Sequence, residues 1–339
     1  MTTQSIAIDA MGGDVGPRVT IPASLDALKK YPNLRIILVG DQIQIESLLK
    51  KYDEINHPRL SIHKTTEVVL MDESPQSALK NKKNSSMRVA INLVKDGDAK
   101  ACVSAGNTGA LMATARFVLK TLQGIDRPAI ASNLPNRKGA TCMLDLGANA
   151  DCSAEQLLQF GIMASVYLDH VEGIKKPRIG LINIGEEPTK GSELYKEAFK
   201  LFKSELPNFI GNIESRNLFD CNAHVLVCDG FVGNTLIKFA EGWMNTFSSL
   251  IKDKINDKIS YKIGAGLIKP ALEDIKNQYD YEEHGGTPLL GVNGIAIVSH
   301  GSSTPKAIMN SIFVAKESIK QNLIKDIASG IDQHLGVIN

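Results

Sequence analysis

The chain has 339 residues, of which 43% are hydrophobic and 22% charged, and its formal net charge is +1. These values are typical of a soluble globular protein large enough for two domains or one large α/β unit. The near-neutral charge argues against a nucleic-acid binder, which needs an excess of lysine and arginine to contact phosphates.

The N-terminus lacks the basic and apolar regions of a secretion signal, and no segment approaches the ~18 uninterrupted apolar residues of a membrane-spanning helix. The expected location is therefore the cytoplasm, with contact to a membrane surface still open. Five cysteines without a CxxC pair predict buried reduced thiols, and the seven histidines form no ligand cluster, so we expect no metal site.

Short apolar runs typical of strands alternate with helical patterns along most of the chain. The expected strands are residues 6–9, 34–39, 60–63, 101–104, 140–145, 179–184, 224–229 and 294–299. The expected helices are residues 17–30, 41–52, 75–95, 109–121, 153–170, 190–205 and 232–256. This alternation predicts a mainly parallel sheet with helices on both faces, a three-layer α/β/α fold. Without a linker or repeat, we expect one large catalytic domain over residues 1–339, in one lobe or two.

Six of the expected strand ends carry small, polar and glycine-rich residues. Ligands of open parallel sheets bind beyond the carboxyl ends of the strands, so six such loops at one edge predict a shared site. The loops are residues 9–14, 104–109, 145–149, 183–187, 229–234 and 299–303.

The loop at 104–110 joins a short buried strand to a helix. Its backbone N–H groups and the positive end of the helix dipole suit an anion. Ser104, Asn107 and Thr108 add side-chain donors, and Gly109 allows close approach of the backbone. An ordinary turn is the alternative for this segment alone.

Single polar residues stand near other strand ends. Lys190 can bind phosphate as a point charge, or it is a solvated lysine neutralised by Glu186 or Glu187. Asn234 lies where a helix is expected to begin, either in an anion site or as an N-cap. His300 is a candidate general acid or base, with a purely structural role as the alternative.

Asp9 and Asp14 flank Gly12 and Gly13, where hydrogen bonds within a tight turn are the favoured role of both carboxylates. The chain carries no Walker A motif, nucleophile elbow, HExxH motif or GxGxxG motif after its first strand. Its chemistry must therefore rest on amide, hydroxyl and backbone donors, one lysine and a few aspartates.

Several blocks occur in an order that is typical of one enzyme family. They are IDAMGGD at 8–14 with Pro17, SAGNTGA at 104–110, RPAIA at 127–131, LDLGAN at 144–149, NIGEE at 183–187 with Lys190 and Gly191, DGFVGN at 229–234, and residues 285–286 and 288–291. With these blocks the chain resembles the PlsX family, the phosphate acyltransferases of bacterial phospholipid synthesis, over almost its whole length.

The resemblance implies transfer of a long-chain acyl group from acyl carrier protein to inorganic phosphate. The acyl phosphate would then supply a membrane glycerol-3-phosphate acyltransferase. The resemblance also implies a homodimer and a fold related to phosphate acetyltransferases and isocitrate-dehydrogenase-like enzymes, with no cofactor. It assigns Lys190 and Asn234 to catalysis or phosphate binding. The other expected phosphate- or substrate-binding residues are Gly12, Gly13, Asp14, Ser104, Asn107, Thr108, Gly109, Asn149 and His300.

A hypothetical mechanism follows from this assignment. Phosphate attacks the thioester carbonyl and the pantetheine thiolate leaves; a thiol of pKa about 8.5 leaves without a strong general acid. Lys190 and loop amides would hold the phosphate dianion, while Asn234 and a backbone N–H would stabilise the tetrahedral oxyanion.

An apolar stripe with nearby lysines marks the segment near 235–282. It contains Phe239, Ala240, Trp243, Met244, Phe247, Leu250, Ile251 and Ile255, followed by Lys252, Lys254, Lys258 and Lys262. A core or dimer-interface helix is the favoured interpretation, and peripheral contact with a membrane or with an acidic carrier protein is the other.

Other functions stay open at this point. One is a coenzyme A-dependent short-chain phosphate acyltransferase, and another is a non-catalytic phosphate-binding regulator. A nicotinamide-dependent decarboxylating dehydrogenase of related fold would need a metal-binding set of aspartates, which the sequence does not offer.

Overall fold

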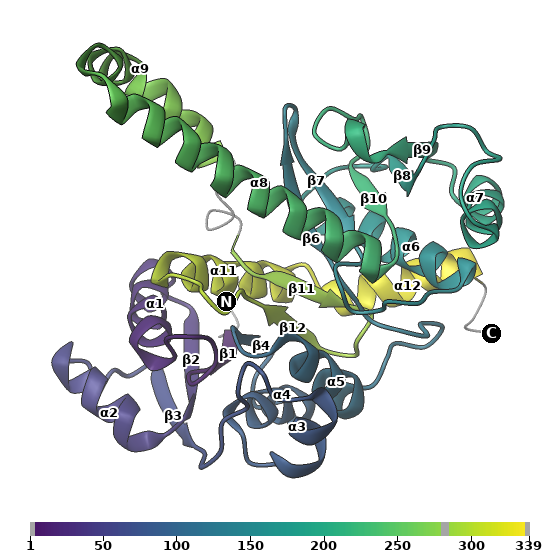
Figure 1. Ribbon diagram of the computed structural model, residues 1–339. Coiled ribbons are helices and arrows are strands. Elements are labelled where there is room, and N and C mark those ends of the chain that lie inside the picture. Colours follow the sequence, from purple (N-terminus) through teal and green to yellow (C-terminus); the bar gives the residue numbers. More distant parts are fainter. Residues whose placement is uncertain (1–3, 279–284, 336–339) are drawn as a thin grey trace.

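The computed structural model describes residues 4–278 and 285–335 and contains two sheets (Figure 1). The strands of the first sheet are β1 (Gln4–Asp9), β2 (Leu34–Gly40), β3 (Leu60–Lys64), β4 (Ala101–Ser104), β5 (Ala129–Ile130), β11 (Thr287–Leu290) and β12 (Ile295–Val298). Those of the second are β6 (Ser132–Asn136), β7 (Gly139–Leu144), β8 (Ile179–Asn183), β9 (Phe209–Glu214) and β10 (Val225–Val227). The orders are β3-β2-β1-β4-β12-β11-β5 and β6-β7-β10-β8-β9.

Most neighbouring strands are parallel, as the sequence predicted; the antiparallel pairs are β11–β12, β11–β5 and β6–β7. The helices that surround the sheets are α1 (Pro17–Lys30), α2 (Gln42–Lys51), α3 (Pro75–Asn81), α4 (Ser86–Asp96), α5 (Thr108–Leu119), α6 (Ala154–His170), α7 (Glu193–Glu205), α8 (Gly230–Asp257), α9 (Ile259–Gln278), α11 (Pro305–Lys320) and α12 (Leu323–Leu335), with a 3₁₀ turn at Ser215–Asn217. The α/β class expected from the sequence is confirmed.

The two faces of the first sheet are covered by different helices. Ile6 and Ile8 of β1 pack with α1, α2 and α11, whereas Ala7 between them packs with α3, α4 and α5. Successive side chains of a strand point to opposite faces, so residues 6–8 of this strand are all apolar because both faces are buried there.

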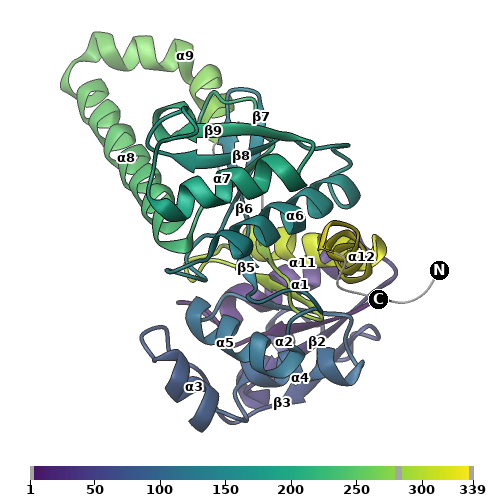
Figure 2. The same ribbon diagram turned by 90° about the vertical axis from the view of Figure 1, so that its right-hand side faces the viewer.

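The second sheet follows the same rule. Leu144 and Leu181 pack with α6, α7 and α12 on one face. On the other face, Met143 and Leu226 pack with the first turns of α8. Each sheet therefore has a core on both of its sides, and Figures 1 and 2 show the two sheets as separate lobes of one molecule.

The path of the chain explains why the sequence contains no domain linker. After β5 the chain builds the whole second sheet and α8–α9, and it then returns to the first sheet with β11 and β12. Helix α11 packs on α1, and α12 packs on α6 of the other lobe. Because the chain crosses between lobes in both directions, neither lobe is one continuous segment.

Two local expectations were wrong. The expected helix at 75–95 is two helices, because the Ser85 side chain accepts a hydrogen bond from Arg88 N and caps a new helix start. The single expected sheet is two, since periodicity identifies strands but not their neighbours.

Helices α8 and α9 form a hairpin that projects beyond both lobes (Figure 1). It contains the apolar segment expected near 235–282, of which residues 279–282 lie outside the described residues. Within the described part of the chain, no helix is both long and apolar enough to cross a membrane.

Candidate functional site

The six glycine-rich loops form two clusters, one on each sheet. Strands β1, β4 and β12 are parallel neighbours, and so are β7, β10 and β8. The first loop cluster is residues 9–14, 104–109 and 299–303; the second is residues 145–149, 183–187 and 229–234. The expectation of one shared edge was wrong, because parallel strand ends share an edge only within one sheet.

In the first loop cluster, three loops pack backbone against backbone. Asp14 N donates a hydrogen bond of 2.8 Å to Gly301 O. A Cβ atom added to Gly12 would lie 2.8 Å from Gly106 N, and one added to Gly13 would lie 2.9 Å from Gly301 O. Gly13 also has a φ of +88°, so both positions require glycine.

A buried carboxylate lies beneath these loops. Asp9 is 1% exposed, and its Oδ2 accepts a 2.6 Å hydrogen bond from Ser104 Oγ, which itself accepts one of 3.1 Å from Gly106 N. Asp9 Oδ1 is buried without a hydrogen-bond partner among the described residues. Burial raises the pKa of Asp9, opposed by the bond from Ser104. The sequence analysis expected Asp9 to bond within a turn and did not predict that its carboxylate is buried. The apolar residues next to Asp9 could have indicated this burial.

The Asn107 side chain fastens a neighbouring loop. Its Oδ1 accepts a hydrogen bond from Ala110 N and caps α5. Its Nδ2 donates to the carbonyl oxygens of Leu70, Met71 and Glu73 at 3.3, 2.7 and 2.9 Å. The amide group expected to face phosphate thus holds the loop at 70–73 against the start of α5.

Three other predicted binding residues lie at the rim of the first loop cluster. Thr108, the first residue of α5, is exposed. Gly109 packs against Pro75, whose Cγ would lie 3.0 Å from an added Cβ. His300 is exposed, with its Nδ1 2.7 Å from Ser302 Oγ.

Asp145 organises the second loop cluster. It is fully buried; its Oδ1 accepts hydrogen bonds from Ile130 N and Ala148 N, and its Oδ2 from Asn149 N and Nδ2, at 2.5–3.2 Å. Burial raises the pKa of Asp145 to about 6 in spite of these bonds. Asn149 Nδ2 also donates to Pro128 O at 2.8 Å. Because Ile130 belongs to β5, the Asp145 carboxylate joins the second loop cluster to the first sheet.

Asn234 lies in the second turn of α8 and not at its start. Asp229 is the N-cap, and its carboxylate accepts a 2.9 Å hydrogen bond from Val232 N. The N-cap alternative for Asn234 was therefore wrong. The Asn234 side chain is exposed and lies over the turn at Gly147, where an added Cβ would be 3.5 Å from Asn234 Cβ and 3.8 Å from its Oδ1.

Lys190 is an exposed cation at the edge of the same cluster. Its backbone is held by Glu187 O, which accepts from Lys190 N at 3.1 Å, and by Asn183 Nδ2, which donates to Lys190 O at 3.2 Å. Within residues 4–278 and 285–335, no carboxylate, including those of Glu186 and Glu187, forms an ion pair with Lys190. Its charge is available to an anion.

The structure thus brings Asn234 to the Gly147 turn, and Gly12, Gly13 and Asp14 to Gly301. It offers backbone and amide donors, glycine turns and an unpaired lysine, a set that suits an oxyanion. Among the described side chains, no group of three histidine, cysteine, aspartate or glutamate residues could hold a metal ion.

Sequence comparison places the chain among fatty-acid and phospholipid enzymes. Residues 4–326 match the model of the family described as "Fatty acid synthesis protein", and the chain belongs to this family. It is 49% identical to the phosphate acyltransferase of Pelotomaculum thermopropionicum, covering 96% of this chain and 95% of the relative. It is 47% identical to that of Chromobacterium violaceum, covering 98% and 96%. The chain is thus an enzyme of the phosphate acyltransferase family, which confirms the resemblance stated from its motifs.

Solved structures support the fold alone. A phosphotransacetylase from Staphylococcus aureus superimposes with a TM-score of 0.59 at 17% identity, covering 94% of each chain. A branched-chain phosphotransacylase from Enterococcus faecalis gives 0.57 at 14% identity, covering 93% of this chain and 99% of the other. The phosphate-acetyltransferase-like fold is confirmed.

Proposed function

We propose that this protein transfers a long-chain acyl group from acyl carrier protein to inorganic phosphate. The main observation in support is that Lys190, which forms no ion pair among the described residues, stands at the loop cluster where Asn234 lies over the Gly147 turn. The high identity to relatives named phosphate acyltransferase supports the same reaction. The two lobes would act as one catalytic domain.

In this proposal, charged and backbone donors of both loop clusters bind the phosphate. Lys190 supplies the positive charge, and the tight turns supply N–H groups. The further members of the phosphate and substrate site are Gly12, Gly13, Asp14, Thr108, Gly109 and His300, whereas the buried Ser104 hydroxyl donates to Asp9 and holds the loops from beneath. Asn107 and Asn149 serve the site by holding its loops, since their amides are bonded to neighbouring carbonyl and carboxylate oxygens.

The reaction needs one displacement at the thioester carbon. A phosphate oxygen forms the new C–O bond, the carbonyl becomes a tetrahedral oxyanion, and the C–S bond then breaks to release a thiolate. Asn234 Nδ2 donates to the oxyanion, and Lys190 holds the phosphate dianion in place. The thiolate leaves as a weak base, so no strong general acid is required.

Exposed apolar side chains support an acyl donor with a long chain. Leu70 and Met71 are 60% and 43% exposed on the loop that Asn107 holds. Met71 Cε would lie 2.7 Å from a Cβ added to Gly301, so this apolar rim borders the first loop cluster. A short acetyl group would leave such a rim unused.

The test is to incubate the protein with palmitoyl-acyl carrier protein, with and without phosphate, and to trap acyl phosphate with hydroxylamine. We expect hydroxamate only when phosphate is present. Product from acetyl-coenzyme A in preference to the palmitoyl carrier would favour the short-chain alternative. No phosphate-dependent hydroxamate from any thioester would leave the non-catalytic phosphate-binding regulator.

We also infer a cytoplasmic homodimer that contacts a membrane surface through the α8–α9 hairpin. Phe239, Trp243 and Phe247 are 72%, 57% and 49% exposed along α8. With about 100° of turn per residue, Trp243 lies on the face of α8 opposite Asn234, so this stripe points away from the reacting groups. An exposed stripe of this size is typical of an interface.

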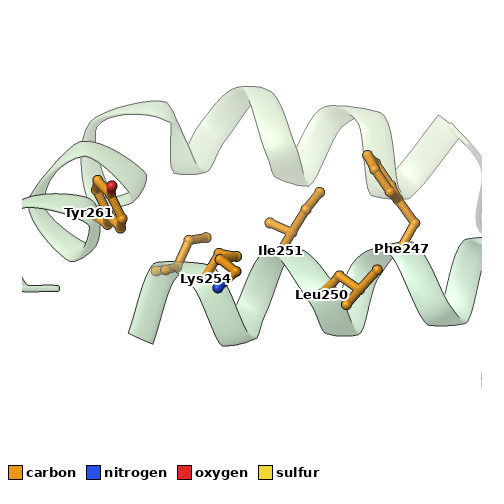
Figure 3. Close-up of a pocket in the computed structure, with 6 residues that line it drawn as sticks. Phe247, Leu250, Ile251, Lys254 and Tyr261 are labelled. Atoms are coloured by element: carbon orange, nitrogen blue, oxygen red, sulfur yellow. The ribbon is translucent and has the colours of Figure 1, made fainter. Parts of the chain in front are cut away.

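A groove of about 330 Å³ lies within the hairpin and is lined by Phe247, Leu250, Ile251, Lys254, Ile255 and Tyr261. Figure 3 shows these side chains on the two helices. Beyond it, Lys258 and Lys262 lie near the exposed Ile259 and Ile263, a combination that suits an anionic lipid surface.

Trp243→Glu and Phe247→Glu should weaken the dimer in sedimentation velocity, and Ile259→Glu with Ile263→Glu should reduce sedimentation with anionic liposomes. Asn245→Glu adds the same charge on the opposite face of α8 and serves as the control. An unchanged mass of Trp243→Glu and Phe247→Glu would contradict the homodimer through this stripe. Unchanged liposome binding of the Ile259→Glu and Ile263→Glu variant would contradict the membrane contact.

A further inference from the structure

A basic recess lies on the first lobe, beside helices α4 and α5. It has a volume of about 400 Å³ and is formed mainly by α4 and the end of α5. Its lining contains three cations, the Phe117 ring, two amides and otherwise only apolar side chains; the polar members are Arg88, Lys95, Lys120, Asn92 and Asn293. Helix α5 begins at the first loop cluster and is 12 residues long, so its C-terminal end lies about 18 Å from that cluster.

The charges of this recess are all positive and are not neutralised. Arg88, Lys95 and Lys120 supply three cations, and no acidic residue belongs to the lining. Among the described residues, none of the three side chains forms an ion pair or a hydrogen bond. The acidic residues nearest in sequence, Asp96 and Asp98, are exposed outside the lining.

Two of these cations lie near the same aromatic ring. Arg88 Cζ lies 5.2 Å and Lys120 Nζ 5.0 Å from the centroid of the Phe117 ring. Cation–π contacts with the half-exposed ring orient both groups, but two like charges near one ring repel each other. An anion that contacts both groups would offset this repulsion and would form charge-assisted hydrogen bonds with them.

Arg88 has no evident purpose in stabilising its own helix. It lies in the first turn of α4, three residues after the Ser85 N-cap, where the helix dipole disfavours a cation. Lys95 in the last turn of α4 and Lys120 at the end of α5 do suit the dipoles of their helices. Arg88 is only half-exposed, so its five N–H donors are partly removed from water without a protein acceptor.

We propose that this recess binds a small organic polyphosphate of nucleotide size. The three unpaired cations supply the charge, and the Asn92 and Asn293 amides supply further hydrogen-bonding groups. The volume of about 400 Å³ matches small-molecule sites rather than the broad surface that an acidic protein would need. The site is separate from Lys190, so its ligand would regulate the enzyme rather than take part in acyl transfer.

The test uses ATP as the probe and adenosine as its uncharged counterpart, with isothermal titration calorimetry on the full chain. We expect ATP to bind the wild-type protein and adenosine not to bind. Arg88→Gln with Lys120→Gln should raise the Kd for ATP at least about tenfold, because two charge-assisted contacts are lost. Lys95→Gln, at an exposed position that cannot disturb the core, should raise the Kd by a smaller factor.

Two controls locate the binding. Lys190→Gln should leave the Kd for ATP unchanged, and Lys50→Gln removes an exposed lysine elsewhere on the first lobe and should also have no effect. Circular dichroism checks the fold of each variant. Absence of ATP binding at millimolar concentration, equal Kd values in the wild type and all recess variants, or loss of binding in Lys190→Gln would each overturn the proposal.

Discussion

Asp9 and Asp145 occupy equivalent places in the two lobes but have different surroundings. Each stands at the end of a buried strand, is followed by a glycine-containing loop, and is almost inaccessible to solvent. Asp145 accepts four hydrogen bonds from N–H groups. Asp9 accepts a 2.6 Å hydrogen bond from Ser104 Oγ, but its Oδ1 has no hydrogen-bond partner among the described residues. Burial raises the pKa of Asp9, and Ser86 and the N–H groups of Met11 and Gly12 join Ser104 in opposing this rise.

This difference indicates that the buried carboxylate contributes more to the structure of the second loop cluster than to that of the first. Asp145 holds its own loop, Asn149 and strand β5 together, so it fixes the second loop cluster against the first sheet. The first loop cluster is held mainly by backbone contacts, between Asp14 and Gly301 and between Gly12 and Gly106. Loss of Asp145 should therefore disturb the molecule more than loss of Asp9.

The largest expected effect is a loss of activity when the proposed catalytic residues of the second loop cluster are replaced. Lys190→Ala and Asn234→Ala should each lower kcat by about 10²–10³, the usual result of removing one donor to a developing oxyanion or its anionic partner. The measurement is phosphate-dependent formation of acyl hydroxamate, with Lys203→Ala as the control lysine on α7. Near-full activity with normal phosphate dependence would remove that residue from the proposed machinery.

Next in size is the structural role of Asp145. Asp145→Asn replaces one acceptor oxygen by an NH₂ group, and each donor left without an acceptor should cost about 1–3 kcal/mol of unfolding free energy. Urea unfolding followed by circular dichroism measures the loss. Equal stabilities of this variant and Asp9→Asn would contradict the contrast between the two lobes.

The same variant tests the pH dependence of stability. A folded-state pKa of about 6 lies above the ordinary value, so the native state binds a proton more tightly and is most stabilised at low pH. As pH rises from 4 to 7, the wild type should lose up to about 3 kcal/mol of unfolding free energy relative to Asp145→Asn. A constant difference across this range would show that the carboxyl group titrates normally.

A smaller effect is expected at Asn107, which holds the loop at 70–73. Asn107→Ala removes a helix cap and three hydrogen bonds to that loop, and it should cost about 1–2 kcal/mol. Hydrogen exchange should become faster at 70–73. Ser153→Ala, which removes the cap of α6 in the other lobe, is the matched control. Unchanged exchange at 70–73 would mean that other contacts hold the loop.

The smallest effect is expected at Asp9. An asparagine there keeps one oxygen for Ser104 and removes the need to bury a carboxyl group, so Asp9→Asn should change unfolding free energy by less than about 1 kcal/mol. Urea unfolding at pH 7 measures it beside Asp145→Asn. A loss larger than that of Asp145→Asn would reverse the comparison.

Local patterns in the sequence were enough to identify much of the fold and the family, and they supplied the residues proposed for the site. The expected helix at 17–30 coincides with α1, and the expected strand at 101–104 coincides with β4. The motif blocks identified the family, and they drew attention to Lys190 and Asn234. These features follow from periodicity, helix-breaking residues and motif spacing, all of which act over a few neighbouring residues.

The tertiary structure alone decided which distant segments meet. It divided the strands between two sheets, made Asp229 and not Asn234 the cap of α8, and turned Asn107 toward the loop at 70–73. It also placed Arg88 beside Phe117. Strand order and the contacts of a polar side chain depend on residues far away in the chain, and no local pattern contains them. The sequence by itself therefore determined the class of fold and the family, and long-range packing determined what each polar residue does.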